Sequence, residues 1–375
     1  MYRILTHPPI HNYGGILQAF ALQQVLNKIG IQSRVIDFFS KKWGSELSKC
    51  GIRAKCSCIK NLLKIIFLGT PLNLPGLLYP NLFRLFKQRF MCLWRLDLNR
   101  KKIFKLTDNH PFVVGSDQVW RCSYARNIES VPFFFLNFAT PDQRKRSIAY
   151  AASFGTDEWE GTPQETEDCA KLLKQFKAVS VREHNGVDIC RDVFGIEAVQ
   201  MPDPTLLLEV NDYNYLIRHW YTKSISKPFI AVYLLDQTEK TTALIEEVSR
   251  VFGYNAQSLI YKPGARRLMD RLPLSIPQWL RCIRDSEFVI TDSFHGCVFA
   301  IIFNKPFVCL GNEKRGSARF DSLLGTFGLQ DRLVTNLESD TILQILKTPI
   351  DWERVNAIRH SEQARAFDFL RKNLD

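Results

Sequence analysis

Short apolar runs alternate with amphipathic stretches along the first 200 residues. Runs of strand length occupy residues 2–6, 33–39, 111–115, 146–151, 178–182 and 198–201. Between them, apolar residues recur at helical spacing, most clearly in 16–29 and 185–194. Buried strands that alternate with helices are typical of a parallel β-sheet covered by helices.

The same alternation continues after a break near residue 204. Apolar runs predict strands at 228–235, 256–261, 287–293 and 307–310, and helical spacing predicts helices at 239–252, 275–283, 297–303, 342–346 and 351–370. The Met-Pro-Asp-Pro sequence at 201–204 has the composition of a linker. At 375 residues the chain is long enough for two cores. We therefore expect two parallel-sheet α/β domains, 1–204 and 205–350.

One strand–turn–helix–strand unit, at residues 287–310, contains the densest set of candidate ligands. Its first turn reads Ser-Phe-His-Gly and follows a predicted strand, at the edge where ligands bind in open α/β sheets. Ser293, His295 and free N–H groups at Gly296 and Cys297 are expected at a helix N-terminus, which suits an anion. The alternative is a serine N-cap beside a surface histidine.

Two arginines follow the next predicted strand. Arg315 and Arg319 come after residues 307–310, so we expect their loop to reach the same edge of the sheet as His295. Guanidinium groups bind phosphate and carboxylate through paired hydrogen bonds. The sequence therefore identifies this edge as a candidate site for a phosphate or carboxylate.

Two loops of the first domain contain further candidates. The loop before helix 16–29 ends in Asn-Tyr-Gly-Gly, so Asn12 and Gly14 are expected either to line a cleft or to form a tight turn with positive φ. This loop lacks the Gly-x-Gly-x-x-Gly fingerprint of dinucleotide-binding folds. Asp117 follows strand 111–115, where a catalytic or substrate-binding carboxylate is often placed, or where Ser116 or Asp117 caps a helix.

Composition narrows the class of protein. Hydrophobic residues make up 46% and charged residues 23% of the chain, as in a globular protein. The N-terminus lacks the pattern of a signal peptide, and no apolar run reaches the roughly 18 residues of a membrane span. None of the ten cysteines forms a Cys-x-x-Cys pair, so we expect no metal site, and reduced thiols in a cytoplasmic protein.

Residues 41–105 form a basic segment. It contains 15 Lys and Arg and only two acidic residues, which is enough to supply the whole net charge of +12. The rest of the chain is close to neutral, so a generally nucleic-acid-like surface is not supported.

Two amphipathic helices, 58–68 and 81–96, are predicted within this basic segment, joined by a Pro- and Gly-rich connector at 69–80. Either the hairpin 58–96 binds an anionic membrane surface, or its apolar face packs on its own domain while its basic face is solvated. Nucleic acid is a poorer fit, because the aromatic residues suit a buried stripe better than a stacking platform. The predicted apolar face of the second helix consists of Leu82, Leu85, Phe86, Phe90, Leu93 and Trp94.

Several sequence motifs occur together and in a fixed order. They read NYGGILQAFALQ, VVGSDQVW, YAASFG, VSVRE, DPTLLL, VITDSFHG and RG-x-x-RF. In this combination the chain resembles the polysaccharide pyruvyl transferase family, with GSDQVW and TDSFHG as the specific pair. The resemblance spans residues 2–333 except for the basic segment, which matches no motif of the family.

This resemblance implies a GT-B-like architecture, in which two Rossmann-like domains face each other across a cleft. Domain 1–204 would hold the acceptor, domain 205–350 would bind the donor, and the C-terminal helix 351–375 would pack back on the first domain. The family transfers pyruvate from phosphoenolpyruvate to a sugar, normally forming a ketal across two hydroxyls and releasing phosphate. No metal or cofactor is implied.

The resemblance also assigns roles to residues. The histidine of the Ser-Phe-His-Gly motif and the arginine of Val-Ser-Val-Arg-Glu are tied to the donor, and here they are His295 and Arg182. Arg319 is a further candidate anion ligand, so two arginines are expected to clamp phosphoenolpyruvate. We expect His295 to act as general acid, and Asp117, matched by its motif, to bind the acceptor or act as base.

The expected acceptor is an oligosaccharide on polyprenyl diphosphate, as in exopolysaccharide or capsule assembly at the inner face of the cytoplasmic membrane. The hairpin 58–96 would bring the cleft to that surface.

Two alternatives stay open. One is a glycosyltransferase that uses a nucleotide sugar on the same scaffold, although no clear ribose-binding acid stands in the expected place. The other is a non-catalytic, membrane-associated scaffold of polysaccharide assembly.

Overall fold

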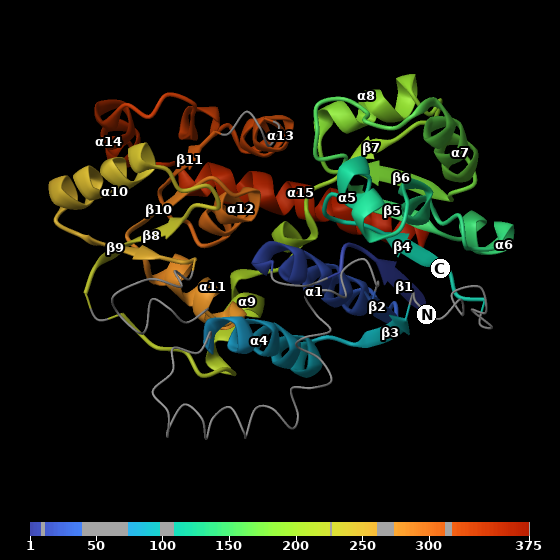
Figure 1. The fold of residues 1–375 in the computed structure, drawn as a ribbon, viewed down its shortest axis with the longest axis horizontal. Helices are drawn as coiled ribbons and strands as arrows, with labels where there is room; N and C mark the ends of the chain where they lie inside the picture. Colours follow the sequence, from blue (N-terminus) through green and yellow to red (C-terminus); the bar gives the residue numbers. More distant parts are fainter. Residues whose placement is uncertain are drawn as a thin grey trace.

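The protein consists of two parallel β-sheets with helices packed on their faces (Figure 1). The computed structural model describes residues 1–8, 12–39, 74–97, 109–225, 227–260, 274–311 and 317–374. Every strand pair in this part of the chain is parallel. The predicted α/β fold with parallel sheets is therefore confirmed.

The first sheet has seven strands in the order β3-β2-β1-β4-β5-β6-β7. The chain adds β2 and β3 on one side of β1 and then returns to place β4 on the other side, so the sheet has its switch point between β1 and β4. The strands are β1 (Tyr2–Leu5), β2 (Ser33–Phe39), β3 (Leu93–Asp97), β4 (Phe112–Val114), β5 (Ile148–Ala152), β6 (Ala178–Val181) and β7 (Val199–Gln200). The helical segments are α1 (Tyr13–Lys28), α4 (Leu74–Phe90), α5 (Cys122–Ile128), η3 (Val131–Phe135), α6 (Pro141–Lys145), α7 (Pro163–Leu173), α8 (His184–Asp192) and η4 (Pro204–Leu207).

The second sheet has five strands in the order β12-β11-β10-β8-β9. Its switch point lies between β8 and β10, because β9 is added on one side of β8 and β10 on the other. The strands are β8 (Phe229–Tyr233), β9 (Asn255–Ser258), β10 (Phe288–Thr291), β11 (Phe307–Leu310) and β12 (Leu333–Val334). The helical segments are α9 (Val210–Arg218), α10 (Glu239–Phe252), α11 (Ile276–Asp285), α12 (Phe294–Ile302), α13 (Ala318–Phe327), η7 (Gln330–Arg332), α14 (Ser339–Lys347) and α15 (Trp352–Asn373).

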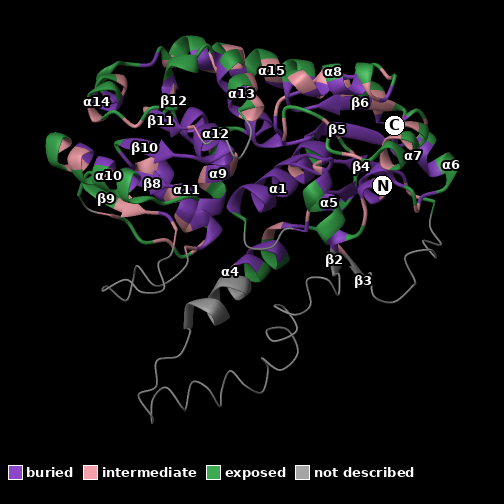
Figure 2. Cartoon of the chain, turned by 45° about the horizontal axis from the view of Figure 1, so that its top comes forward, coloured by how far each residue is buried: buried purple, intermediate pink, exposed green. Residues whose placement is uncertain are grey.

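The apolar core is continuous between the two sheets. Helices α1 and α12 are buried along almost their whole lengths (Figure 2). A helix that is apolar on all sides needs protein on all sides, and α12 packs against the second sheet, α11, α13 and η4. Tyr13 of α1 stacks on Trp279 of α11 with ring centroids 5.3 Å apart, and its hydroxyl donates to the carbonyl of Leu274. The starts of α1 and α12 are therefore held together by shared packing.

The C-terminal helix α15 runs from the second sheet back to the first (Figure 1). Gln363 donates to the carbonyl of Leu206 at 2.9 Å, and Arg365 donates to the carbonyl of Gln200 at 2.8 Å. Both acceptors belong to the segment that leaves the first sheet. The helix thereby fixes this segment from outside.

Helix α1 begins three residues earlier than residue 16, where the sequence places it. Asn12 caps the helix, because its side chain accepts a hydrogen bond from the N–H of Gly15 at 3.2 Å. Gly14 and Gly15 are helical, so the alternative of a tight turn with positive φ is wrong. The early start places Gly14 at the inner end of a buried helix.

The second helix predicted in the basic segment differs from the structure at both ends. Instead of residues 81–96, α4 covers Leu74–Phe90 and begins inside the predicted connector. Residues Leu93–Asp97 form strand β3, because the edge of β2 offers backbone groups that a neighbouring strand can satisfy. The predicted helix 58–68 lies outside the described residues.

Helix α4 packs on protein from both sheets. Phe86 is fully buried and its ring lies 6.5 Å from that of Trp220, which follows α9. Lys87 is also buried and pairs with Asp37 of β2 at 3.0 Å. Leu85, expected on the apolar face, is 47% exposed. The described part of the hairpin is therefore packed on its own protein, and membrane binding through residues 58–96 stays a prediction.

None of the described helices is long and apolar enough to cross a membrane.

Two neighbouring positions on α4 test this packing. Phe86→Ala should lower the free energy of unfolding by about 3–5 kcal/mol, because it empties a filled core position. Leu85→Ala, one residue away on the exposed face, should change it by no more than about 0.5 kcal/mol. Urea denaturation measures both values. Equal, small effects would show that α4 does not pack as described.

Candidate active site

The buried carboxylate of Asp203 lies where the first sheet ends and the second begins. Oδ1 accepts hydrogen bonds from the N–H and the hydroxyl of Thr205, at 3.0 and 2.7 Å. Oδ2 accepts from Nη1 of Arg182 at 2.9 Å and from the hydroxyl of Ser116 at 3.1 Å. The Asp203 side chain has no exposed surface. One carboxylate thus connects the ends of three different strands.

Electrostatics keep this carboxylate ionised. Burial by itself raises the pKa of the Asp203 carboxyl, because it penalises the charged form. His295, Arg182 and Thr205 outweigh burial and hold the pKa well below its usual range. Asp203 is therefore a fixed negative charge at neutral pH.

Arg182 follows β6 and is almost completely buried. Its Nε donates to Glu183 at 2.9 Å, while its Nη1 donates to Asp203. The guanidinium also lies 4.3 Å above the ring of Phe294, at the start of α12. Burial by itself lowers the pKa of this guanidinium, but the carboxylates of Glu183, Asp203 and Asp117 raise it above its ordinary value. Arg182 is thus permanently charged, and two of its hydrogen-bonding nitrogens are already used.

Asp117 follows β4 with a backbone conformation that non-glycine residues rarely adopt, at φ 61°. Its carbonyl accepts from the N–H of Ser153 at 3.0 Å, which fixes the loop to the end of β5. Its side chain accepts from the N–H of Gln118 at 2.9 Å. The alternative that Ser116 or Asp117 caps a helix is wrong, because the next helix starts at Cys122. A left-handed residue at a strand end is a common feature of functional loops.

His295 approaches this cluster from the second sheet. Helix α12 begins at Phe294 rather than at residue 297, so His295 lies in its first turn. The histidine is only 7% exposed, and its Nε2 lies 3.7 Å from Oδ2 of Asp203. The alternative of a surface histidine is therefore wrong.

Gly14 is the residue of α1 against which His295 packs. A Cβ atom at Gly14 would overlap Nδ1 and the neighbouring ring carbons of His295. At Gly15, by contrast, a Cβ would approach Asn12 and Asp117 no closer than 3.4 Å. Only the absence of a side chain at Gly14 lets the histidine of one sheet reach the carboxylates of the other.

The turn before α12 differs from the predicted serine cap. Ser293 occupies the N-cap position, but its side chain forms no capping hydrogen bond. The N–H of Cys297 donates to the carbonyl of Ser293 at 3.1 Å, so it is not free as expected. A Cβ at Gly296 would overlap Oγ1 of Thr291, so this glycine is needed for packing. The N–H groups earlier in the first turn have no partner in the helix, which favours an anion there.

Arg319 lies in the first turn of α13. Burial lowers its pKa to about 10, and the positive charges of Arg182 and Arg121 act in the same direction. The guanidinium therefore remains charged at neutral pH, in a place where an anion would relieve the cost of its burial. The other expected arginine, Arg315, lies outside the described residues.

Two hydrogen bonds attach α13 to the first sheet. The N–H of Ala318 donates to the carboxylate of Asp157 at 3.2 Å. In the opposite direction, the N–H of His184 donates to the hydroxyl of Ser322 at 2.9 Å. Each of the two helices, α8 and α13, thus has its first N–H satisfied by a side chain from the other half of the protein. Together they hold the start of α13, which contains Arg319, against the first half of the protein.

A comparison with protein-family models identifies the family of this chain. The model described as polysaccharide pyruvyl transferase matches residues 12–314, which is most of the chain. The chain belongs to the polysaccharide pyruvyl transferase family. A comparison with functionally curated proteins found no match.

Solved structures show the same architecture at low sequence identity. The UDP-GlcNAc 2-epimerase from Neisseria meningitidis, bound to UDP-GlcNAc, is 10% identical with a TM-score of 0.53, over 99% of this chain and 98% of that chain. The UDP-GlcNAc 2-epimerase from Methanocaldococcus jannaschii is 12% identical with a TM-score of 0.50, over 93% and 92%. At this identity the likeness shows the fold alone. The GT-B-like architecture expected of a pyruvyl transferase is confirmed.

Three residues near the site were not predicted from the sequence as site residues. Asp203 was interpreted as part of a linker, although an Asp two residues before a Thr can form a local side-chain turn. Glu183 is buried, bonds Arg182 and accepts from the hydroxyl of Ser153 at 2.8 Å. His7 lies with Nε2 2.6 Å from the carbonyl of Gln118, and burial lowers its pKa against the opposing effect of Asp117.

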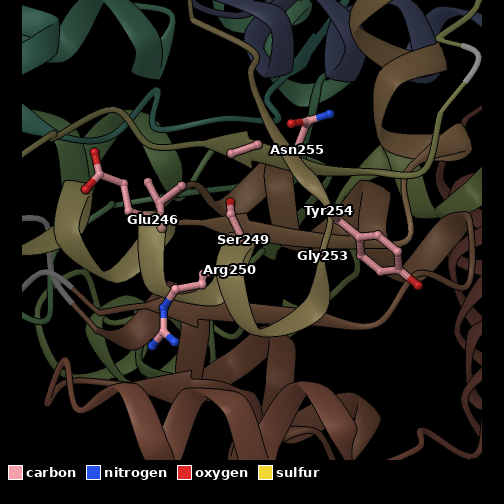
Figure 3. Close-up of a pocket in the computed structure, with 8 residues that line it drawn as sticks. Glu246, Ser249, Arg250, Gly253, Tyr254 and Asn255 are labelled. Carbon is pink, nitrogen blue, oxygen red and sulfur yellow. The ribbon is translucent and has the colours of Figure 1, made fainter.

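A surface hollow of the protein lies away from this site (Figure 3). Its lining residues come from the end of α10 and the start of β9, including Arg250, Tyr254 and Asn255. That is the amino end of the strand, opposite to the carboxyl ends that hold the site. The hollow is therefore separate from the charged cluster around Asp203.

Among the described residues, no three His, Cys, Asp or Glu side chains converge as a metal site would require.

The contact between Gly14 and His295 can be tested by substitution. Gly14→Ala should lower the free energy of unfolding by about 1–3 kcal/mol, because the new methyl group must displace the imidazole or the helix. Gly15→Ala, which adds the same atom to the next residue, should change stability by no more than about 0.5 kcal/mol. Thermal unfolding of both variants measures the difference. Equal melting temperatures would contradict the close packing of His295 on α1.

Proposed function

We propose that this protein transfers pyruvate from phosphoenolpyruvate to a pair of sugar hydroxyls in a polysaccharide repeat unit, forming a pyruvate ketal and releasing phosphate. The observation that carries the proposal is the approach of His295 from one sheet to Arg182 and the carboxylates of the other. Family membership supports a transferase of this class. The arrangement combines the imidazole of His295, the guanidinium groups of Arg182 and Arg319, and the carboxylates of Asp117 and Asp203.

The donor carries a phosphate and a carboxylate, so its site must supply positive charge. Arg319 is charged and buried, and an anion beside it would regain part of the cost of that burial. The first turn of α12 adds backbone N–H groups that suit a phosphate. Arg182 contributes a fixed charge, and its hydrogen bonds to Glu183 and Asp203 already use two of its nitrogens. We therefore assign both guanidinium groups to the donor, with Arg182 as a fixed supporting charge.

The reaction requires a proton and a nucleophile. His295 gives a proton to the methylene carbon of phosphoenolpyruvate, which leaves an oxocarbenium-like centre at the neighbouring carbon. A sugar hydroxyl attacks this centre, and Asp117 takes its proton. A second hydroxyl then forms the other ketal bond as the carbon–oxygen bond to phosphate breaks. Of the two hydroxyl protons, one replaces the proton that became part of the methyl group, and the other leaves with phosphate.

The acceptor side of the site is assigned to the first sheet. Asp117 lies at the end of β4, and Asn12 caps the neighbouring helix α1. We propose an oligosaccharide acceptor carried on polyprenyl diphosphate, which matches a transferase of polysaccharide assembly. Nothing in this assignment requires a metal ion or cofactor.

Replacing His295 tests the acid. His295→Ala should reduce acceptor-dependent phosphate release from phosphoenolpyruvate by at least about 100-fold, the usual contribution of general acid catalysis. His219→Ala is a matched control, because His219 is exposed and stacks on Tyr215, away from the site. The assay uses a panel of aryl and lipid-linked galactosides, glucosides and mannosides.

Two results would contradict the proposal. Substantial turnover by His295→Ala would remove this residue from the acid role. No release with any acceptor, no binding of phosphoenolpyruvate by calorimetry, and binding of a nucleotide sugar instead would favour a glycosyltransferase. Binding of phosphoenolpyruvate without release would keep the donor assignment and reject the acceptors of the panel.

Replacing Arg319 tests the donor contact. Phosphoenolpyruvate should raise the melting temperature of the wild type, and Arg319→Gln should weaken its binding roughly 10- to 100-fold, because a charge-assisted hydrogen bond contributes about 1.5–3 kcal/mol. Arg250→Gln removes an arginine that is largely exposed and pairs only with a neighbour on its own helix in the contacts described. It should bind as the wild type does. Unchanged affinity in Arg319→Gln would assign the anion site to other residues.

A further inference from the structure

We propose that Asp203 is the positioning residue of His295: it accepts the Nε2–H of the imidazole and leaves Nδ1 as the nitrogen that exchanges a proton with substrate. This inference deepens the proposed function, because it specifies which atom acts as the acid. It concerns a residue that the sequence presents as part of a linker and as the first residue of the DPTLLL motif, with no role assigned to it.

The geometry leaves Nε2 of His295 facing the carboxylate. Nε2 is buried, and within the described residues it has no hydrogen-bond partner at normal distance. Oδ2 of Asp203 lies 3.7 Å away, just beyond that distance. A buried donor without an acceptor costs free energy, so a small approach of the two halves gains a bond to a charged acceptor. Asp203 cannot move away, because Thr205, Ser116 and Arg182 hold both of its oxygens.

The other ring nitrogen lies on the side of α1. Nδ1 is the atom that a Cβ at Gly14 would overlap, so it lies beside the N-terminus of α1 rather than beside Asp203. A neutral histidine has a hydrogen on one ring nitrogen only, and a carboxylate at Nε2 selects that nitrogen. Nδ1 then has its lone pair free to take a proton from solvent and to give it to substrate. A side chain at Gly14 would overlap this nitrogen, so only glycine leaves room for it beside α1.

The carboxylate also places a negative charge 3.7 Å from Nε2 of the imidazole. Among the described residues, the other charged groups of the site are Arg182 on the same oxygen, Glu183 on Arg182, Arg319 on α13 and Asp117 after β4. At the start of α1, the described residues Asn12 and Gly14 are uncharged.

The same oxygen links the acid to the base. Ser116 donates to Oδ2 of Asp203, and Asp117 is the next residue along the loop. A single carboxylate thus fixes the orientation of His295 and the loop that presents Asp117. This explains why one buried aspartate is bonded by residues from β4, β6 and η4 at the same time.

The first arm of the test is the pH dependence of turnover. Asp203→Asn keeps the shape of the side chain but removes its charge, so the alkaline limb of the kcat profile should move to lower pH by about one to three units. KM for phosphoenolpyruvate should change much less than kcat at neutral pH. Thr205→Val removes a hydrogen bond to Oδ1 and keeps the charge, so the limb should stay in place even if the rate falls. An unmoved limb in Asp203→Asn would overturn the inference.

The second arm needs no activity and no variant of Asp203. Nitrogen-15 NMR of histidine-labelled protein, with the signal of His295 assigned by its loss in His295→Ala, reports which ring nitrogen carries the hydrogen. We expect the Nε2–H form, with that hydrogen protected from exchange with water. A hydrogen on Nδ1 would overturn the inference. If phosphoenolpyruvate does not bind and no acceptor supports phosphate release, the proposed function fails while this measurement still decides the contact between Asp203 and His295.

Discussion

A buried charge needs partners, and the partners of Asp203 determine how the site is assembled. Its carboxylate has no exposed surface, so every stabilising group must come from the protein. Arg182, Ser116 and Thr205 supply the hydrogen bonds, and His295 supplies a facing group from the second sheet. Since breaking one member would leave an uncompensated charge in the core, these side chains form one unit rather than a list of independent contacts.

The placement of this unit follows from chain topology. In each sheet, the direction in which successive strands are added reverses once. This switch point lies between β1 and β4 in the first sheet and between β8 and β10 in the second. The loops at those two points contain Asp117 and His295. Helix α1 from the first sheet and α12 from the second pack into one core, which brings the two loops together. The fold therefore creates a single site from two sheets, with the carboxylates on one side and the histidine on the other.

The sequence predicted much of the fold, because strands and helices of this type leave clear apolar patterns. It also pointed to the loops of Asp117 and His295, since both follow apolar runs and contain groups that react. Asp203 was harder to find: an Asp between two prolines has the local appearance of a linker, and only the approach of Arg182 and Ser116 reveals its role. The apolar pattern also gave a wrong prediction at residues 93–97. It predicted the end of a helix there, but these residues pair with the edge of the first sheet as strand β3.

The described part of the basic segment, residues 74–97, belongs to the architecture of the protein. Its helix α4 packs against Trp220, and its strand β3 completes the edge of the first sheet. A segment that contributes a strand to a sheet cannot be removed like a surface loop, because its deletion exposes a new edge and empties a core. Any role of the segment at a membrane must therefore be dissected by point substitutions on its exposed side. In evolutionary terms, the segment could vary freely only where it contacts neither sheet.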